Sequence, residues 1–316
     1  MPTESAPRRI ASLLASATEM LCALGAGEEV VAISHECDFP PQAILKPRVT
    51  VSHVAAPSSL AIDDQVRGML AAGEPLYGID TDTLVALAPD LIVTQAQCDV
   101  CAVKYQDVLD LVANEPSLAK ARVVALNPTT LEEIFADIHR VGESIARNDA
   151  ALEYVTKLRA RVDAVRKATD IPIAQRPRTA CIEWIDPLML AANWMPQLVD
   201  LAGGSQPQAA QGHHSTYNRW DEVVTFDPEV LIVMPCGFDL ARAVSESDTL
   251  RAKPGWGDLS AVRNRRVYAV DGNAYFNRSG PRIVDSLEIL AGLLHPERLG
   301  LPAEVIAGAA VWRSLD

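Results

Sequence analysis

The feature that most constrains the fold is a repeated segment in which a helical stretch ends at a proline and a buried strand follows. Residues 84–93 read Leu-Val-Ala-Leu-Ala-Pro-Asp-Leu-Ile-Val, and residues 223–233 read Val-Val-Thr-Phe-Asp-Pro-Glu-Val-Leu-Ile-Val. A proline cannot continue a helix, and the branched apolar run after it is typical of a strand buried on both faces. Residues 9–27 and 179–204 form a second pair, each ending in glycines. The repeats predict two similar lobes related by pseudo-symmetry.

Short apolar runs rich in β-branched residues alternate with longer helical stretches along the chain. The runs predicted as strands are residues 9–14, 30–34, 91–95, 123–126, 179–184, 230–235 and 267–270. Such alternation indicates βαβ units, so the predicted fold class is α/β, with two doubly wound lobes on mostly parallel sheets. Ligands of open α/β sheets bind beyond the carboxyl ends of the strands, so a ligand cleft is expected between the lobes.

A long amphipathic helix is expected between the two repeats. Its apolar residues recur at intervals of three and four: Leu152, Val155, Leu158, Val162 and Val165. Asn148 or Asp149 is expected to cap its start, and Pro172 to follow its end. A helix of this length spans about 30 Å, enough to join the lobes, although an ordinary crossover helix is the alternative. The predicted division is an N-terminal lobe over residues 1–147, a connecting spinal helix over 148–170 and a C-terminal lobe over 171–316.

Charge and hydropathy exclude two kinds of partner and favour one compartment. The net charge of −13 over 316 residues argues against nucleic acid, whose phosphates need a basic face. No stretch approaches the roughly 20 apolar residues of a membrane span. Residues 8–24 are superficially similar to an export signal, but Glu19 interrupts them and Cys22 follows Leu21 rather than a small residue. We therefore expect a cytoplasmic, non-membrane protein with six reduced cysteines.

Side chains able to hold a metal or a polar ligand follow the predicted strand at residues 30–34. They are His35, Glu36, Cys37 and Asp38, which is a dense group for a turn. The alternative is a turn in which Asp38 is only a cap.

Cysteines follow three predicted strands. Cys98 and Cys101 form a Cys-x-x-Cys after residues 91–95, Cys236 follows residues 230–235, and Cys37 follows residues 30–34. Brought to one cleft, these four thiols would make a site for Zn or Fe, and the Cys-x-x-Cys alone could be a redox pair. Small buried thiols without chemistry are the alternative.

Aromatic, imidazole and arginine side chains are expected on the second lobe's side of the cleft. They are Trp184, Trp194, His213, His214, Tyr217, Tyr275, Phe276 and Arg278. Aromatic rings suit a flat, partly apolar ligand, an imidazole could ligate its metal, and an arginine could pair with its anionic group. The two tryptophans have a core role as their alternative.

Two further acidic motifs have both a structural and a functional interpretation. Residues 16–19 predict a capping box of Ser16 and Glu19, the alternative being a helix N-terminus that faces the cleft. Asp82 and Asp221 each precede the repeat's proline by seven residues. They either stabilise two helix N-termini, by roughly 0.3–1 kcal/mol each, or form a symmetric pair of anchors for a partner.

The chain resembles the cobalamin-binding branch of the substrate-binding proteins of ABC transporters. The resemblance is carried by Cys37-Asp-Phe-Pro-Pro-Gln42, Leu87-Ala-Pro-Asp-Leu-Ile-Val93 and Tyr275-Phe-Asn-Arg-Ser-Gly-Pro-Arg282. It implies two lobes on a spinal helix, Tyr275 and the loop at residues 215–217 against a corrin ring, and docking of Asp82 and Asp221 onto arginines of a membrane permease.

These observations predict a non-catalytic protein that holds cobalamin, another corrinoid or a related metal chelate between its lobes. The alternative is a metal or metal-cluster protein that uses the cleft cysteines and histidines. A thiol oxidoreductase that uses Cys98 and Cys101 has the least support, because no nucleophile triad or acid/base pair is evident.

Overall fold

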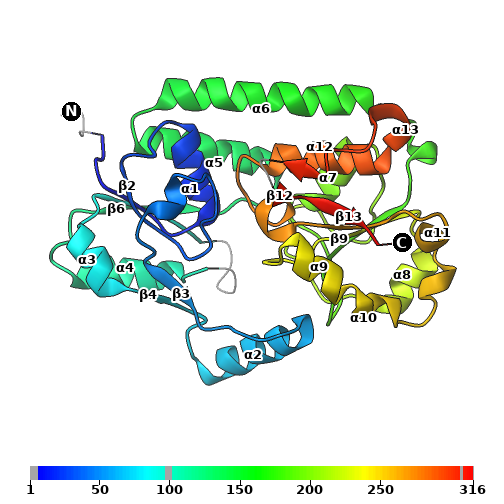
Figure 1. Cartoon of the computed structure of the whole chain (residues 1–316). Coiled ribbons are helices and arrows are strands. Elements are labelled where there is room, and N and C mark those ends of the chain that lie inside the picture. Colours follow the sequence, from blue (N-terminus) through cyan, green and yellow to red (C-terminus); the bar gives the residue numbers. More distant parts are fainter. Residues whose placement is uncertain (1–5, 97–101, 307–308, 316) are drawn as a thin grey trace.

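A computed structural model describes residues 6–96, 102–306 and 309–315, and it shows two α/β lobes with one long helix lying along both (Figure 1). Each lobe is built on its own sheet. Within the described residues, no helix combines the length and the apolar character needed to cross a membrane.

The N-terminal lobe has a parallel sheet in the order β2-β1-β5-β6. Its strands are β1 (Ile10–Ser12), β2 (Val30–Ile33), β5 (Leu91–Gln95) and β6 (Arg122–Leu126). A separate antiparallel ribbon, β3 (Thr50–Ser52) with β4 (Tyr77–Ile79), carries a helix between its strands. The helices are α1 (Ala15–Ala23), η1 (Ala43–Leu45), α2 (Ser59–Ala72), α3 (Thr81–Leu87), α4 (Tyr105–Asn114) and α5 (Leu131–Ser144).

The C-terminal lobe has a mixed sheet in the order β13-β10-β9-β7-β8, whose three central strands are parallel. Its strands are β7 (Thr179–Trp184), β8 (Met189–Leu190), β9 (Val230–Val233), β10 (Val267–Val270) and β13 (Trp312–Ser314); β11 (Val305–Ile306) and β12 (Ala309–Ala310) form a small hairpin. The helices are η2 (Ile173–Gln175), α7 (Met195–Leu201), α8 (Trp220–Phe226), α9 (Leu240–Glu246), α10 (Asp248–Arg251), η3 (Trp256–Asp258), α11 (Ser260–Arg263), η4 (Gly272–Phe276), α12 (Ile283–Leu294) and α13 (Pro296–Leu299). The predicted class, two α/β lobes with mostly parallel sheets, is confirmed.

The sequence repeat has a matching backbone conformation in the two lobes. Helix α3 ends at Ala88 with φ 42°, and α8 ends at Asp227 with φ 49°, both in the left-handed region. A proline follows each of these residues, and the chain then enters the central strand of its sheet, β5 or β9. The two segments therefore stop a helix and start a strand by the same local geometry.

Helix α6 (Asn148–Ala168) lies along both lobes, between α5 and α12 (Figure 1). Arg159 pairs with Glu132 of α5, and Arg161 pairs with Glu288 of α12. The predicted cap is wrong, because Arg147 occupies the N-cap position and Asn148 is already helical. The apolar stripe also differs at its first position, where Leu152 is 60% exposed and Ala151 is buried instead.

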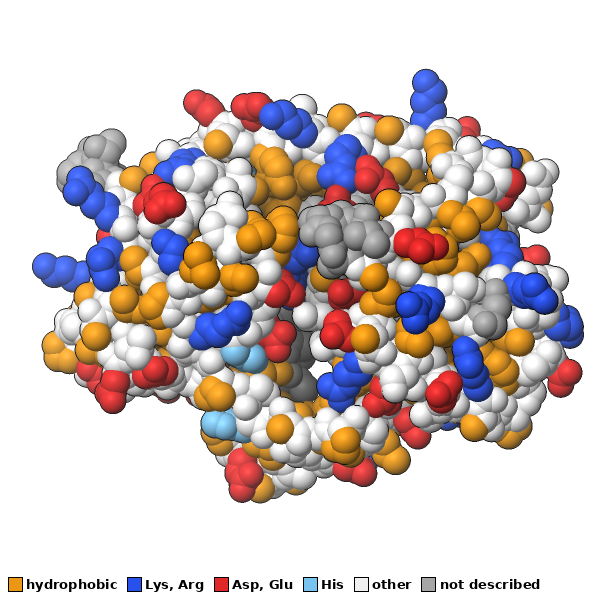
Figure 2. All heavy atoms as spheres, viewed as in Figure 1, with side chains coloured by type: hydrophobic (Ala, Val, Ile, Leu, Met, Phe, Trp, Pro, Cys, Tyr) orange, Lys and Arg blue, Asp and Glu red, His pale blue; other side chains and the backbone are white. Residues whose placement is uncertain are grey.

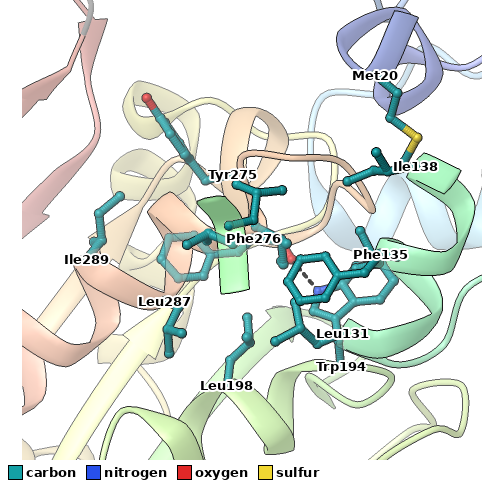
Figure 3. Close-up of a cluster of buried hydrophobic side chains, with 14 of the residues drawn as sticks. Met20, Leu131, Phe135, Ile138, Trp194, Leu198, Tyr275, Phe276, Leu287 and Ile289 are labelled. Carbon is teal, nitrogen blue, oxygen red and sulfur yellow. Dashed lines mark hydrogen bonds between the residues drawn. The ribbon is translucent and has the colours of Figure 1, made fainter. Parts of the chain in front are cut away.

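One hydrophobic core runs through both lobes and beneath the spinal helix. Figure 3 shows Leu131 and Phe135 of α5 beside Trp194 and Phe276 of the other lobe. The Trp194 Nε1–H donates to the carbonyl oxygen of Phe276 at 2.9 Å, which satisfies the indole inside the core. The outer face of each sheet has its own smaller cluster. Separating the lobes would expose this shared core to water, so their relative position is strongly favoured.

Candidate ligand-binding cleft

Loops at the carboxyl ends of the parallel strands meet between the lobes. Asn273, after β10, donates to Asp38, after β2, at 3.4 Å. Figure 2 shows the surface hollowed between the lobes, with acidic side chains gathered around the hollow and histidine side chains on its N-terminal-lobe side. This is the edge at which open α/β sheets bind ligands.

Four charged residues from both lobes form what we term the ion-pair cluster: Glu19, Asp38, Arg278 and Arg282. Arg278 donates to Glu19 at 3.1 Å and also pairs with Asp38. Arg282 donates to Glu19 at 2.6 Å. The side chains of Glu19 and Arg278 are only 2% and 6% exposed, whereas Asp38 is 43% exposed. The cluster is thus buried at the base and reaches solvent at Asp38.

Arg278, the arginine predicted to pair with an anionic group of a ligand, already has its charge neutralised by carboxylates of the ion-pair cluster. Burial opposes the charge on Arg278, but Glu19 and Asp38 outweigh it and raise the pKa of the guanidinium above its ordinary value. Arg278 is therefore charged and already paired with two carboxylates.

The predicted capping box is wrong, because Glu19 serves this cluster. Helix α1 starts at Ala15 with Leu14 at the N-cap, so Ser16 lies inside the helix. The Ser16 Oγ is buried and has no hydrogen-bond partner within the described chain. Glu19, one turn on, points across to Arg278 and Arg282 rather than back to its own helix start.

A turn after β10 positions Arg278. The Asp271 side chain accepts from the Ala274 N–H at 2.7 Å and begins the π-turn η4. A Cβ at Gly272 would lie 2.4 Å from the carbonyl oxygen of Pro235, so only glycine fits there. Burial raises the pKa of Asp271, and the nearby charge of Asp38 adds to the effect.

An aromatic pair lies on the N-terminal side of the cleft. The rings of His35 and Tyr77 stack with centroids 5.5 Å apart, and the His35 Nδ1 lies 2.7 Å from the Thr50 Oγ1. Burial lowers the pKa of His35, and the neighbouring Glu36 offsets part of the shift. Neutral imidazole is the form that ligates metals.

A second aromatic pair lies at the carboxyl ends of β7 and β9. The rings of Trp184 and Phe238 are 5.4 Å apart, and the Arg242 guanidinium lies over Phe238 at 3.8 Å. The Trp184 Nε1–H is buried without a hydrogen-bond partner in the described chain. An unpaired donor of this kind is costly, and a polar atom of a ligand or a water would satisfy it.

Beside this pair, Glu183 is a buried acid that accepts from the Ser215 hydroxyl at 2.6 Å. Burial raises its pKa, while the bonds from Ser215 and the Ala192 N–H act in the opposite direction.

Three predicted site residues, Trp194, Tyr275 and Phe276, are buried. Trp194 and Phe276 belong to the shared core, 6% and 0% exposed, which leaves them little or no surface to offer a ligand. Tyr275 is also buried, with the Arg282 guanidinium 5.2 Å from its ring centre. His213 and His214 are exposed on a loop of the C-terminal lobe.

The structure does not test the predicted four-thiol site, because two of its cysteines lie outside the described residues. Cys37 is fully buried in the N-terminal lobe, with its Sγ 3.0 Å from the Thr18 Oγ1. Cys98 and Cys101 lie outside the described residues. Within the described ranges, no three His, Cys, Asp or Glu side chains gather as a metal site.

Sequence reasoning missed four residues of the cleft region, Phe39, Tyr77, Phe238 and Arg282. It also missed that Glu19 pairs with arginines of the other lobe. The Arg282 guanidinium lies 4.4 Å from the Phe39 ring centre. Phe238 was detectable, because it follows a predicted strand end. Tyr77 was not, because it is brought to His35 by the short ribbon β3–β4.

The two predicted docking acids lie where the repeat places them. Asp82 is exposed in the first turn of α3, and Asp221 is exposed in the first turn of α8. Asp221 is paired with Arg219, which lowers its pKa.

Two lobes that share a core, a helix spanning both and a cleft at the strand ends define a two-lobed binding protein. The chain belongs to the periplasmic binding protein family, whose model matches residues 10–274. Proteins of this family bind their ligands without catalysis, so the prediction of a non-enzymatic binding protein is confirmed.

Two curated relatives and two solved structures illustrate the similarity. The vitamin B12-binding protein of Vibrio cholerae is 25% identical over 291 residues, covering 89% of this chain and 86% of that protein. The uncharacterized ABC transporter substrate-binding lipoprotein YvrC of Bacillus subtilis is 22% identical over 298 residues, covering 92% and 81%. The structure of the Vibrio cholerae periplasmic vitamin B12 binding protein BtuF has a TM-score of 0.65 at 23% identity, covering 91% of this chain and 96% of that one. The periplasmic heme-binding protein BhuT with two hemes has a TM-score of 0.66 at 21% identity, covering 90% and 97%.

The expectation of a cytoplasmic protein is wrong. The family and these relatives are periplasmic or lipoprotein binding proteins, which points to a location outside the cytoplasm. The expectation came from not recognising an export signal in residues 8–24, and that carries no weight against a family match over most of the chain. The expectation of a reducing compartment rested on the same reasoning and is wrong for the same reason.

Proposed function

We propose that this protein binds a flat metal chelate, a corrinoid or a related macrocycle, in the cleft between its lobes. The observation that carries the proposal is the presence of one aromatic pair in each lobe, His35 with Tyr77 and Trp184 with Phe238, where Trp184 supplies the accessible ring because Phe238 is only 2% exposed. A planar ligand between such pairs buries its faces against rings. The vitamin B12-binding and heme-binding relatives support this class of ligand.

Polar groups around the aromatic pairs would orient the ligand. The Trp184 Nε1–H is buried and has no partner in the described chain, so it would donate to an amide or carboxylate oxygen of a ligand only where that oxygen displaces its present cover. Asp38, the exposed member of the ion-pair cluster, could accept from amide groups, and Arg278 lies directly behind it. His35, with its lowered pKa, is the described residue best suited to ligate a chelated metal.

We propose that an ABC permease receives the ligand through docking on Asp82 and Asp221. Both carboxylates are exposed, and they lie at equivalent positions of the two repeats. The name of the relative from Bacillus subtilis supports a transporter partner. We also keep the division into residues 1–147, 148–170 and 171–316 as a proposal, with the refinement that α6 itself covers Asn148–Ala168.

Titration of the purified chain with cyanocobalamin, dicyanocobinamide and hemin tests the ligand. Calorimetry and absorbance should report saturable one-to-one binding of at least one chelate. No heat and no spectral shift with all three would overturn the proposal.

A pair of tryptophan variants separates the cleft from the surface. Trp184→Ala removes a ring of the proposed wall and should weaken binding about tenfold or more, since an aromatic contact and its buried area contribute about 1.5–2 kcal/mol. Trp256→Ala is the matched control, because Trp256 stacks on Trp220 on another part of the C-terminal lobe. Equal affinities for the two variants would place the ligand elsewhere.

A further inference from the structure

Helix α2 reaches across the cleft from one lobe to the other. Its only connection along the chain is the ribbon β3–β4 of the N-terminal lobe. In Figure 1 it lies beneath the gap between the lobes, and in Figure 2 its surface bounds the hollow below. Anything that enters or leaves the hollow on this side passes α2.

The contacts of α2 with the C-terminal lobe are polar. Ser59 donates to the Glu246 carboxylate from its backbone N–H at 3.3 Å and from its hydroxyl at 3.1 Å. The Tyr217 hydroxyl donates to Asp63 at 2.8 Å. Just before the helix, Arg242 donates to the carbonyl oxygen of Ala56 at 3.2 Å.

The fully buried residues of α2 are polar. The buried residues of α2 are Ser59 and Asp63, which are the two that bond to the other lobe. Leu60 and Leu70 of the same helix are 45% and 41% exposed. Ile62, Val66 and Met69 are partly buried, so release of α2 exposes some apolar surface, but no fully buried apolar side chain of the helix. Water can replace each of the hydrogen bonds when the helix moves.

The negative charge of Glu246 is unfavourable at the position that it occupies in its own helix. Glu246 is the last residue of α9, at the negative end of that helix's dipole. Its carboxylate instead meets the N-terminus of α2, which has no acidic residue in its own first turn. The C-terminal lobe therefore supplies the negative charge that the start of α2 lacks, and the two helix ends stabilise each other only while α2 is closed.

We propose that α2 is a polar latch across the mouth of the cleft, held by Glu246 and Tyr217, which opens while the two lobes stay fixed. Movement of the lobes would disrupt the shared core and the ion-pair cluster, whereas movement of α2 breaks hydrogen bonds that water can replace and uncovers no fully buried apolar side chain of the helix. The part the latch plays in ligand passage rests on the proposed function, but the latch itself does not.

Hydrogen exchange of the full-length, ligand-free protein tests the latch directly. Glu246→Ala and Tyr217→Phe should each speed amide exchange in residues 59–72 about fivefold or more. Exchange in α6 and α12 should not change. The control is Glu153→Gln, an exposed acid of α6 that pairs with Lys157 one turn away. Unchanged exchange in α2, or an equal increase in α6 and α12, would overturn the proposal.

Stopped-flow binding of dicyanocobinamide or hemin then tests passage. A latch that does not touch the ligand gates both directions, so the association and dissociation rates should rise by a similar factor in Tyr217→Phe, with Kd changed less than twofold. A rise in the dissociation rate alone would make Tyr217 a ligand contact and overturn the gating role. If neither chelate binds the unaltered protein, the proposed function fails, while the exchange experiment still decides on the latch.

Discussion

Replacing Glu19 by glutamine separates two physical roles for this residue. A capping residue of a helix contributes about 0.5–2 kcal/mol to stability, and usually near 1. In the structure, Glu19 is instead the buried acid that holds Arg278 and Arg282 at 3.1 and 2.6 Å. Glutamine keeps the size and one acceptor oxygen but removes the charge. Among the residues of the ion-pair cluster, the two arginines would then keep one carboxylate, that of Asp38, which is 43% exposed.

The expected loss follows from leaving a buried charge uncompensated. Breaking a buried ion pair by removing one partner costs about 3–5 kcal/mol. For a chain of this size, 1 kcal/mol corresponds to about 2 °C, so the midpoint of thermal unfolding should fall by about 6–10 °C. Circular dichroism at 222 nm during heating measures it, and a calorimetric scan checks that unfolding remains cooperative.

The matched control is Glu132→Gln, which removes an exposed partner of Arg159. An exposed pair contributes about 0–1 kcal/mol, so its midpoint should fall by less than about 2 °C. If Glu19→Gln and Glu132→Gln lose the same amount, the ion-pair cluster does not hold the lobes as argued here.

A triple variant refines this result. Glu19→Met, Arg278→Met and Arg282→Leu together remove the buried charges and keep similar volumes. Such replacements are often neutral or stabilising in other proteins, so the triple variant should unfold at a higher temperature than Glu19→Gln. It should also bind the chelate more weakly than the unaltered protein, because Arg278 lies directly behind Asp38 at the cleft.

Three further predictions concern buried groups elsewhere. Burial raises the pKa of Asp137 from 3.8 to about 6; the folded protein therefore binds the proton more tightly than the unfolded chain, and stability falls as the pH rises from about 4 to about 6. Asp137→Asn should flatten this dependence and gain about 1–3 kcal/mol at pH 8, measured by urea unfolding at several pH values. Burial also raises the pKa of the Cys181 thiol, so iodoacetamide should label it only after unfolding, as mapped by mass spectrometry. Gly272→Ala should cost about 3 kcal/mol or more and weaken chelate binding, because its Cβ would lie 2.4 Å from a carbonyl oxygen. Gly257→Ala, with no atom within 4 Å of the new Cβ, should do neither.

The central strands could be predicted from the sequence, because their burial leaves a strong signal. Residues 91–95, 179–184 and 267–270 were predicted with the bounds that the structure has. Strands of a parallel sheet covered on both faces form nearly continuous apolar runs, so the ends of such a run mark the ends of the strand. The edge strands β8 and β13 and the ribbon β3–β4 are two or three residues long, too short to show a period.

The cleft could be located from the sequence, but the partners inside it could not be paired. Asp38 and Arg278 were each predicted as site residues, while their contact with each other and with Glu19 joins distant parts of the chain. The capping-box spacing predicted that Glu19 bonds to the start of its own helix, but in the structure its carboxylate pairs with arginines of the other lobe. Trp184 and Trp194 look alike in sequence; only Trp194 finds a carbonyl oxygen inside the core, which leaves Trp184 with an unpaired donor.

The contacts between the lobes are of two kinds, and their chemistry assigns them different tasks. The shared core and the buried cluster around Glu19 are costly to break, so they hold the aromatic pairs at a fixed separation. A preformed cleft of this kind loses little binding free energy to reorganisation. Fixed lobes do not part to admit a ligand, however, whereas the hydrogen bonds that hold α2 to the C-terminal lobe, through Ser59 and Asp63, can be replaced by water. Affinity and access should therefore vary independently in this protein: Trp184→Ala should change Kd, whereas Tyr217→Phe should change both rate constants and leave Kd nearly constant.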